Sequence, residues 1–314
     1  MDTRWRIELL GRLRATQGDH VDTRFRARRT GALLAYLAYY TDRPHPREVL
    51  IELLWPEAEP HSGRSSLSRE FSSLRRQLEP PGYSPNGWMA AGAVIVADRD
   101  SVQLNPAACA TDVQAFEAAL QIAARARSSA ERATRLTEAA ELYRGELLPG
   151  YFEDWILPER QRLAELFLDA LDQLTASLEQ AGDHHGAIQW ARRAVAADPL
   201  REEGHHALIR LLCAAGQPAA ALRQYHELER LLAEEPGMAP DPVIRALVRE
   251  IERGPAMIHR VLPPCLGRGA PKAGHPPSLR GRAPERSRVI SGVKSRRQRP
   301  PVPSPFCSPR STRK

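Results

Sequence analysis

Residues 63–79 read GRSSLSREFSSLRRQLE, and this stretch decides the fold expected for the first third of the chain. At about 100° per residue its large apolar side chains fall on one narrow stripe, as expected of an amphipathic helix packed on a core. The stripe consists of Leu67, Phe71, Leu74 and Leu78. The opposite face is small, hydroxylated and cationic. Five serines within residues 65–73 are a poor choice for helix propensity alone, so the pattern favours a functional outer face over a merely solvated one.

That outer face is typical of a helix that enters the major groove of DNA. Serine hydroxyls can donate to phosphates or base edges, their small size lets the backbone approach, and arginine can pair bidentately with guanine. The residues expected in the groove are Ser65, Arg69, Ser72, Ser73 and Arg76. On one flank, Arg64, Ser68 and Arg75 are further candidates for phosphate or groove-edge contacts.

Two shorter helices are predicted before this one. Residues 28–40 (RRTGALLAYLAYY) carry leucines at helical spacing. Residues 46–55 (PREVLIELLW) form the second, with Pro46 in its first turn. Its predicted buried side chains are Val49, Leu50, Leu53 and Leu54.

Short strands flank the three helices. Residues 4–10 and 12–16 indicate a small N-terminal sheet. Residues 94–97 and 101–104 flank Asp98-Arg99-Asp100 and predict a β-hairpin. Arg99 at its tip is a candidate for a minor-groove or phosphate contact, whereas the two neighbouring acids favour an ordinary exposed turn.

Short strands, three helices and a hairpin follow the order of a winged helix-turn-helix, with the third helix as recognition helix and the hairpin as wing. Residues 5–105 resemble the OmpR-type winged-helix domain that begins bacterial regulators of the antibiotic regulatory protein (SARP) family. The resemblance is carried by RRTGALLAYLAYY, PREVLIELLWPE, HSGRSSLSREFSSLRRQLE and VIVADRDSVQLN. It implies binding of double-stranded DNA through residues 64–76. The serine-rich groove face departs from the family, so the family's preferred DNA sequence does not carry over.

Residues 106–253 have an almost continuous helical pattern, which begins with Asp112 as the expected N-cap. Gly182-Asp183 and Gly216-Gln217 lie 34 residues apart, which is the tetratricopeptide period. Ala187 and Ala221 occupy equivalent positions in the two units. Each unit would be a pair of antiparallel helices that stacks on its neighbours.

This helical region resembles the bacterial transcriptional activator domain, the tetratricopeptide-like module that follows the winged helix in the same family. The segment GELLPGYFEDWILPER joined to the repeat is the most specific part of the match. The resemblance implies dimerisation, paired protomers on direct repeats in DNA, and contact with RNA polymerase. Longer relatives add a nucleotide-binding ATPase domain, but a G-x-x-x-x-G-K-[ST] loop does not occur in this sequence.

The net charge of +7 is distributed very unevenly along the chain. Residues 1–105 hold 15 arginines and 13 acidic residues, and residues 106–253 hold 16 arginines and 24 acidic residues. Residues 254–314 hold 14 lysines or arginines, every lysine of the chain and a single acid, and are predicted to form a disordered basic tail. Two interpretations of this tail remain open: an arm that binds nucleic acid loosely, or a remnant in a different reading frame. The predicted domains are therefore residues 1–105, 106–253 and 254–314.

Other classes of protein are disfavoured by what the sequence lacks. It contains no apolar stretch long enough to cross a bilayer, no signal-peptide pattern and no C-x-x-C, G-x-S-x-G or H-E-x-x-H motif. The histidine pairs at residues 184–185 and 205–206 have no partners at typical metal-ligand spacing. We therefore expect a cytoplasmic, nucleoid-associated protein that is not an enzyme and uses neither a cofactor nor a metal.

The sequence thus predicts a mainly α protein: an α+β winged helix-turn-helix, an all-α tetratricopeptide-like repeat domain and a disordered tail. Its predicted function is sequence-specific activation of transcription at promoter DNA, with RNA polymerase and a second copy of the chain as partners. The alternative is a tetratricopeptide-like scaffold whose winged helix contacts other proteins. The net charge of only +2 in residues 1–105 is low for a DNA-binding domain and keeps that alternative open.

Overall fold

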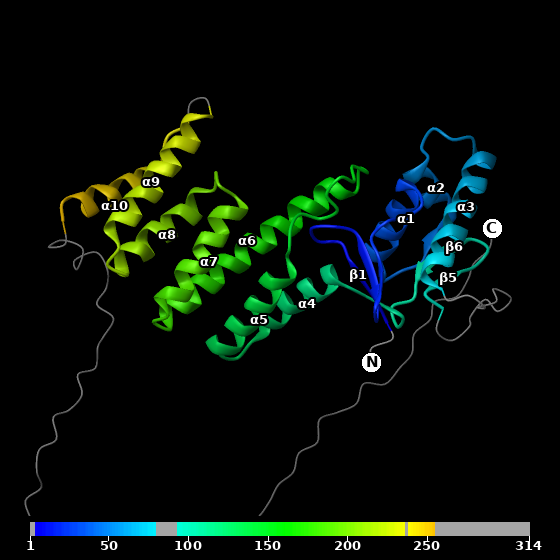
Figure 1. Cartoon of the computed structure of the whole chain (residues 1–314), viewed down its shortest axis with the longest axis horizontal. Helices are drawn as coiled ribbons and strands as arrows, with labels where there is room; N and C mark the ends of the chain where they lie inside the picture. The colour runs from blue at the N-terminus through cyan, green and yellow to red at the C-terminus, as the bar shows by residue number, and fades with distance from the viewer. Residues whose placement is uncertain (1–3, 80–92, 236–237, 255–314) are drawn as a thin grey trace, which may run out of the picture. The chain divides into compact units, whose positions relative to one another are not determined.

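The computed structural model describes residues 4–79, 93–235 and 238–254 (Figure 1). A region of short strands and three helices comes first, and helices alone follow it from residue 112 onward in the described chain. The mainly α class, with an α+β winged helix followed by an all-α helical domain, is confirmed. Of the predicted tail of residues 254–314, all but Gly254 lies outside the described residues.

The first sheet joins the two ends of the winged-helix region. Its strand order is β3-β2-β1-β7, with β1 parallel to β7 and antiparallel to β2. The strands are β1 (Trp5–Glu8), β2 (Arg14–Gln17), β3 (His20–Asp22) and β7 (Cys109–Thr111). The last strand lies past residue 105, so a segment at the start of the predicted helical domain completes the N-terminal sheet.

The three helices of the winged-helix region are α1 (Arg28–Tyr39), α2 (Arg47–Leu54) and α3 (Pro60–Leu78). The α3 stripe of four apolar side chains is fully or almost fully buried, as predicted. In α2 two details of the prediction are wrong. Pro46 belongs to the short strand β4 (His45–Pro46), whose pairing with β6 holds it outside the helix. Val49 is 43% exposed, because α2 packs on the core through Leu50 and Leu54.

The predicted hairpin is present as β5 (Ile95–Ala97) and β6 (Ser101–Leu104), which pair antiparallel. The second sheet has the order β4-β6-β5, so the hairpin is anchored on the segment that leads into α2. The backbone amide of Arg47 also donates to the carbonyl of Asp100, at 2.9 Å. These contacts hold the wing beside α2 and α3.

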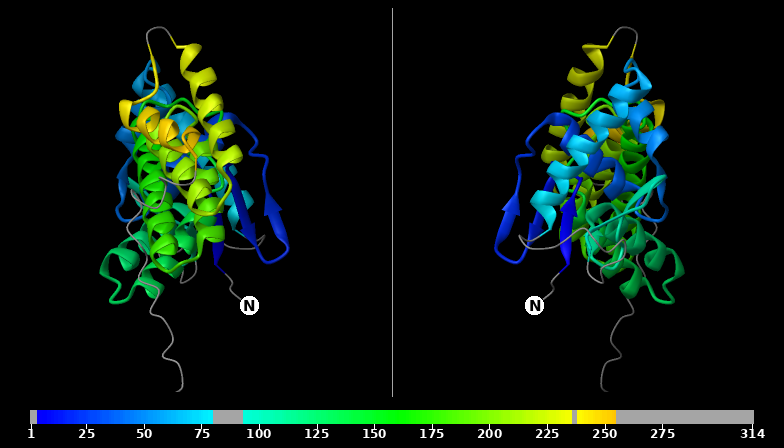
Figure 2. Two further views of the ribbon diagram at one scale, coloured as in Figure 1. Left: turned by 90° about the vertical axis from the view of Figure 1, so that its left-hand side faces the viewer. Right: turned by 90° about the vertical axis from the view of Figure 1, so that its right-hand side faces the viewer.

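Seven consecutive helices follow β7 in the described chain, and each packs against the next (Figures 1 and 2). They are α4 (Asp112–Arg125), α5 (Ser129–Leu142), α6 (Ile156–Gln180), α7 (His184–Ala197), α8 (Glu202–Ala214), α9 (Pro218–Ala233) and α10 (Pro242–Glu252). Gly182 and Gly216, 34 residues apart, both have the positive φ that a tight helix-to-helix turn requires. Ala187 and Ala221 are completely buried, where small side chains let neighbouring helices approach.

The start of α4 differs from the prediction. The N-cap is Thr111, whose hydroxyl accepts from the amide of Gln114 at 3.1 Å, and Asp112 is the first residue of the helix. Asp112 is 5% exposed and is turned toward β1 instead. Among the described residues, none of the helices is both long and apolar enough to span a membrane.

Candidate nucleic-acid interface

The position of α3 is fixed from both ends. Its apolar stripe packs on the core of the winged-helix region, and Pro60 stands in the first turn, where a missing N–H costs nothing. At the other end the indole Nε1 of Trp5 donates to the carbonyl of Leu78 at 2.9 Å. Because both ends are held, the rotation of the helix about its axis is fixed, and one face of it points to solvent from end to end.

We call these solvent-facing residues the α3 outer face. They are Ser65, Ser68, Arg69, Ser72 and Arg76. All five are exposed, and they follow one another at helical spacing. Arg64 is exposed beside them, and Arg99 is exposed on the wing. The structure therefore brings together most of the residues that the sequence singles out.

Two of the three serine hydroxyls on this face donate within their own helix. Ser65 Oγ donates to the carbonyl of His61 at 3.1 Å, and Ser72 Oγ donates to the carbonyl of Ser68 at 2.8 Å. These bonds satisfy the hydroxyl protons and leave the oxygen lone pairs facing solvent. In the free protein Ser65 and Ser72 thus offer acceptors and little bulk, rather than the donors anticipated from the sequence.

Ser73 does not belong to the outer face, contrary to the prediction. It is 7% exposed. The helical angle places Ser73 on the same flank as Glu70, and α1 packs on α3 along that flank. Thr30, in the first turn of α1, donates its hydroxyl to Glu70 there. Packing by α1 therefore removes Ser73 from the surface available to a large ligand.

Arg75 is held by the protein rather than left free for DNA. Its Nη2 donates to the carbonyl of Ile95 at 3.3 Å, and its Nε lies 3.6 Å from the carboxylate of Glu79. The guanidinium carbon also lies 4.8 Å from the centre of the Phe71 ring. Arg75 thus ties strand β5 of the wing to α3, and its predicted phosphate contact stays a prediction.

A hollow of about 490 Å³ borders the outer face on the side of α1, and we call it the α1-side hollow. Arginines supply most of its charge. Its lining comprises Arg26, Ala27, Ser68, Arg69, Glu70, Ser72, Ser73 and Arg76. Within the described part of the chain, Arg69 and Arg76 form no salt bridge, and Arg69 Nη2 donates only to the hydroxyl of Ser66, at 3.0 Å. The hollow therefore carries uncompensated positive charge.

A second hollow, of about 400 Å³, borders the outer face on the side of the wing, and we call it the wing-side hollow. It is lined by Arg47, Glu48, Ile51, Arg64, Leu67, Ser68, Arg99 and Asp100. Three arginines again outnumber the acids, although Arg64 lies 3.6 Å from the carboxylate of Glu48. Ser68 lines both hollows, so the outer face forms a ridge with a cationic depression on each side.

The wing tip is organised by Asp98. Its carboxylate accepts from the amides of Asp100 at 2.8 Å and Ser101 at 2.6 Å, and these bonds hold the pKa of Asp98 below its usual value. The carbonyl of Asp98 accepts from the guanidinium of Arg47 at 3.1 Å. Because the carboxylate is turned onto the backbone of the tip, Arg99 is left as an exposed cation there.

Sequence reasoning overlooked Arg26 and Arg47. Arg26 lies in a run of four arginines within residues 24–29, and this charge run just before α1 was the available signal. Arg47 had no comparable signal. Its importance comes from tertiary structure, because the pairing of β4 with β6 brings the start of α2 against the wing.

The second histidine pair includes a side chain that is part of the packed protein interior. His205 is completely buried and hydrogen-bonds to the carbonyl of Pro199 and to Gln224, both at 3.0 Å. In the residues that the structure describes, no group of three or more His, Cys, Asp or Glu side chains is placed to hold a metal ion.

Comparison with protein families finds the bacterial transcriptional activator domain over residues 111–252. The chain is 31% identical over 228 residues to the regulatory protein AfsR of Streptomyces coelicolor, a match covering 70% of this chain and 21% of AfsR. It is 27% identical over 237 residues to the transcriptional regulatory protein MoaR1 of Mycobacterium tuberculosis, a match covering 71% of each chain.

Among solved structures, Mycobacterium tuberculosis EmbR, determined in complex with a low-affinity phosphopeptide, matches with a TM-score of 0.60. The two are 25% identical, and the match covers 80% of this chain and 65% of EmbR. The chain thus spans about a fifth of the length of AfsR and about two thirds of that of EmbR. The match to EmbR extends beyond the activator domain, whose family match begins only at residue 111.

Proposed function

Since this chain is a SARP-type protein with a bacterial transcriptional activator domain, we propose that it activates transcription by binding promoter DNA through α3 and the β5–β6 wing. The proposal assigns residues 1–105 to DNA binding, residues 106–253 to contacts with proteins and residues 254–314 to a separate tail. It places the protein in the cytoplasm, at the nucleoid.

One observation carries this proposal: the α3 outer face lies between two arginine-lined hollows. A ridge of small serines with exposed Arg69 and Arg76 fits the major groove, where arginine pairs with the O6 and N7 atoms of guanine. The phosphate backbones run on both sides of that groove. The two hollows would therefore meet phosphates, with Arg26 on one side and Arg47, Arg64 and Arg99 on the other.

This arrangement also answers the objection from net charge. The net charge of +2 in residues 1–105 also counts acidic residues that lie elsewhere in the region. Examples are Glu52, Glu57 and Glu59, between the middle of α2 and the start of α3. The local charge is what a phosphate meets, because screening at physiological salt limits electrostatic interactions to about 8 Å. Arginines concentrated along one helix support a nucleic-acid partner even when the total charge of the domain is small.

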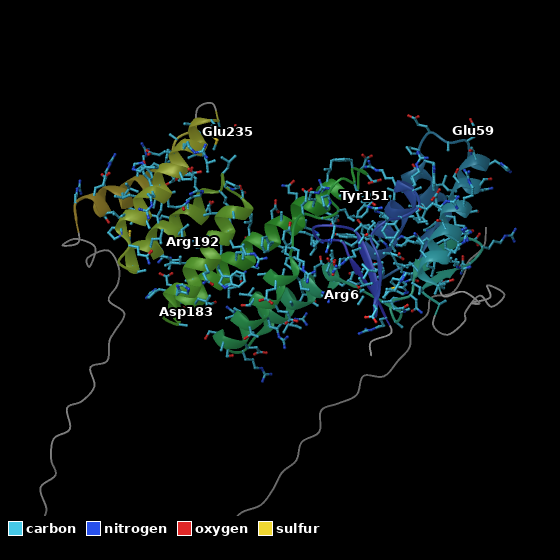
Figure 3. All side chains as sticks on the ribbon, in the orientation of Figure 1. Arg6, Glu59, Tyr151, Asp183, Arg192 and Glu235 are labelled. Atoms are coloured by element: carbon cyan, nitrogen blue, oxygen red, sulfur yellow. The ribbon has the colours of Figure 1, made fainter. Side chains whose placement is uncertain are left out.

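The test begins with the full chain and a pool of random duplex DNA, from which bound sequences are selected. Affinity for the selected duplex is then compared between the wild-type protein and the variants Arg69→Ala and Arg76→Ala. Each variant should lose about 1–3 kcal/mol of binding free energy if its guanidinium reads a base. The matched control is Arg192→Ala, an exposed arginine on α7 that Figure 3 labels well away from α3. Equal affinities for all four proteins would refute the assignment of α3.

For the helical domain we propose dimerisation on DNA and recruitment of RNA polymerase. Its net charge of −8 and its exposed apolar side chains, such as Ile122 at 44% and Leu200 at 41%, suit contacts with proteins better than contacts with DNA. Sedimentation of the protein with the selected duplex should give two chains per direct-repeat site. One chain per duplex at saturation would contradict dimerisation on DNA.

The competing function is a scaffold in which the winged helix contacts another protein. Salt distinguishes the two, because each phosphate contact releases counterions and makes DNA affinity fall steeply with ionic strength. A DNA-binding protein should lose about a thousandfold or more in affinity between about 50 and 200 mM salt if it makes about six phosphate contacts. Weak binding to every duplex, together with little dependence on salt, would favour the scaffold.

A further inference from the structure

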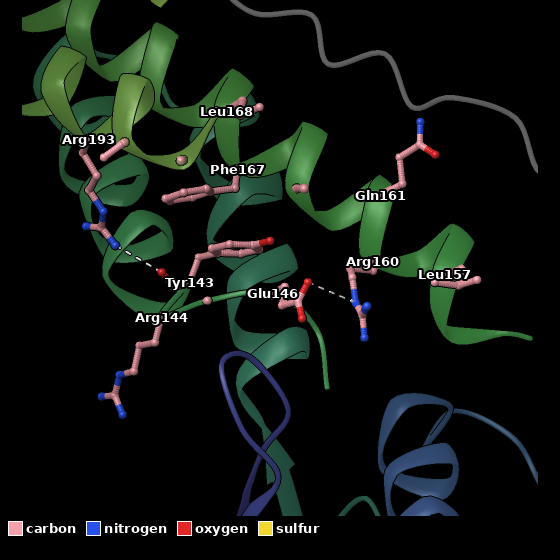
Figure 4. Close-up of a pocket in the computed structure, with 13 residues that line it drawn as sticks. Tyr143, Arg144, Glu146, Leu157, Arg160, Gln161, Phe167, Leu168 and Arg193 are labelled. Atoms are coloured by element: carbon pink, nitrogen blue, oxygen red, sulfur yellow. Dashed lines mark hydrogen bonds and ion pairs between the residues drawn. The ribbon is translucent and has the colours of Figure 1, made fainter. Parts of the chain in front are cut away.

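A cavity of about 580 Å³ lies in the helical domain, and its lining includes no residue of the α3 outer face (Figure 4). Its walls come from α6, from the C-terminal part of α7 and from the loop after α5. The loop contributes Tyr143, Arg144, Gly145 and Glu146. This volume is within the range of small-molecule sites in proteins, about 300–1,000 Å³.

The charge of the cavity lining is positive. The lining contains three arginines, Arg144, Arg160 and Arg193, and one carboxylate, that of Glu146, which lies 3.6 Å from Arg160 (Figure 4). Arg144 is paired with Glu8, outside the lining, at 3.4 Å. Arg193 forms no salt bridge in the described part of the chain. Its Nη2 donates to the carbonyls of Ala140 at 2.6 Å and Tyr143 at 3.1 Å. A half-buried guanidinium that is paired only with carbonyls retains its charge for an anion.

Few guanidinium donors are left for that anion. Arg160 already donates through Nε to Leu147 at 2.9 Å and through Nη2 to Leu148 at 3.0 Å and Tyr151 at 3.2 Å, in each case to the backbone carbonyl. The remaining N–H groups suit one compact anionic group. A carboxylate, with a single charge and two oxygens in a plane, matches them better than a doubly charged phosphate, which costs more to desolvate.

The rest of the lining is flat and apolar. The rings of Tyr143 and Phe167 stack with their centres 4.2 Å apart and 11° between their planes, and Figure 4 shows them between Arg193 and Arg160. The guanidinium of Arg193 lies 5.3 Å from the centre of Phe167. The aliphatic side chains of Leu157, Ala164 and Leu168 complete the wall. Such a wall suits a planar apolar body attached to the anionic group.

We propose that this cavity binds a small aromatic carboxylate. Its carboxylate would pair with Arg193, whose Nε and Nη1 form no hydrogen bond in the described part of the chain, and its ring would lie against the apolar wall of α6. The loop that lines the cavity also holds the N-terminal sheet, since the amide of Gly11 donates to the carbonyl of Glu146 at 2.8 Å and Arg144 lies 3.4 Å from Glu8. A bound ligand therefore contacts the same segment that joins the two folded regions.

The test uses the full chain and titration calorimetry with naphthoate as probe, compared with its neutral amide, naphthamide. Naphthoate should bind at least about tenfold more tightly than naphthamide, because only the carboxylate forms an ion pair with the guanidinium of Arg193. Equal affinities, or no binding of naphthoate, would overturn the proposal.

A pair of variants assigns the binding to this cavity. Ala164→Leu fills the cavity from α6, and naphthoate affinity should fall by about tenfold or more. Ala176→Leu makes the same change at an exposed position of the same helix outside the cavity, and affinity should stay within about twofold of the wild type. Undiminished binding by Ala164→Leu, or equal loss in both variants, would show that naphthoate binds elsewhere.

A second pair changes the charge with a side chain of nearly equal size, and Gln161→Glu also removes the hydrogen bond that Gln161 Nε2 donates to Glu165 at 2.9 Å. Gln161 lies on the exposed rim of the cavity, so Gln161→Glu adds a negative charge there and should weaken naphthoate binding by about threefold. Gln173→Glu adds the same charge at an exposed site of α6 that does not line the cavity, and it should leave the affinity unchanged. A Gln161→Glu variant that binds naphthoate as tightly as Gln173→Glu would contradict an anion site.

Discussion

The carboxylate of Asp112 accepts hydrogen bonds from the backbone amide of Leu9, at 2.9 and 3.0 Å from its two oxygens. The amide of Leu10 donates to the same carboxylate at 3.0 Å. Both amides belong to the residues that directly follow β1, and Asp112 begins α4. One side chain of the helical region thus accepts the backbone hydrogen bonds of the segment after the first strand. Since β7 pairs with β1 just before it, the N-terminal sheet and the helical domain are joined by buried polar contacts as well as by the chain.

Asp112→Ala should therefore destabilise the protein strongly. The change leaves two buried amides without an acceptor, which costs about 2–4 kcal/mol of the free energy of unfolding. Asp169→Ala, an exposed aspartate on α6, is the control and should change it by less than about 0.5 kcal/mol. Chemical denaturation monitored by circular dichroism measures both. Equal stabilities of the two variants would contradict the role given to Asp112.

Gly145 is a second point of contact between the two regions. A Cβ atom at this position would lie 3.0 Å from the backbone Cα of Gly11, which cannot move aside as a side chain can. Gly145→Ala should thus destabilise the fold by about 1–3 kcal/mol. Gly204 lies inside α8, and a Cβ atom there would be 3.5 Å from its nearest neighbour, Cγ2 of Val195. Gly204→Ala should instead be neutral or stabilising by up to about 1 kcal/mol. Gly145→Ala should therefore have the lower melting temperature of the two variants. A lower melting temperature for Gly204→Ala would contradict the close contact between Gly145 and Gly11.

The apolar periodicity of the sequence predicted the helices well, because each of them buries a continuous stripe. The stripe of α3 and the repeat marked by Gly182 and Gly216 are examples. Strand β7 has only three residues, too few for a visible alternation, and it forms because β1 offers it a partner. The N-cap was misplaced by one residue because Thr111 and Asp112 are both good caps, and only the tertiary partner of Asp112 distinguishes them.

The candidate interface was predictable to the extent that it lies on one helix. Helical angles correctly grouped Ser65, Arg69, Ser72 and Arg76 as exposed. The same angles could not show that α1 covers Ser73, since that depends on how two helices pack. They also could not show that Arg47, from another helix, reaches the wing. Tertiary neighbours therefore decided the outcome for Ser73 and Arg47, whereas the arginine run of residues 24–29 was a sequence signal for Arg26.

His205 makes stability depend on pH. With the proton on Nε2 it donates to Pro199 and accepts from Gln224 at Nδ1, so a second proton would set two donors against each other. Burial lowers the pKa of His205 from its ordinary value of 6.5. A lowered pKa means that its stabilising contribution is complete above pH 6.5 and is lost as the pH falls through the folded-state value.

We therefore expect the free energy of unfolding to fall by on the order of 1 kcal/mol between about pH 7 and pH 5 through this residue. His205→Gln cannot gain this charge and should show a correspondingly smaller loss over the same range. Urea denaturation at several pH values measures both proteins. Parallel pH profiles would show that His205 is not responsible.

Arg75 and Arg76 are neighbours with different expected roles. Arg75→Ala removes the bond to Ile95 and the contact with Phe71, so it should lower the free energy of unfolding by about 1–2 kcal/mol. Arg76→Ala should stay within about 0.5 kcal/mol of the wild-type stability and yet weaken binding of the selected duplex. Thermal unfolding and fluorescence anisotropy separate the two effects. If Arg76→Ala proved as unstable as Arg75→Ala, its effect on DNA binding would no longer indicate a direct contact.

Arg26 should contact a phosphate rather than a base, because it precedes α1 and faces α3 across the α1-side hollow. Arg26→Ala should then weaken binding to every duplex by a similar factor and reduce the slope of log K against log salt by about 1. Arg69→Ala should act differently, since the loss of a base contact relaxes the preference at one position of the site. Arg192→Ala again serves as the control with an unchanged slope. A loss confined to certain sequences in Arg26→Ala would mean that this arginine, too, reads bases, and that the DNA lies closer to α1 than the α3 outer face alone implies.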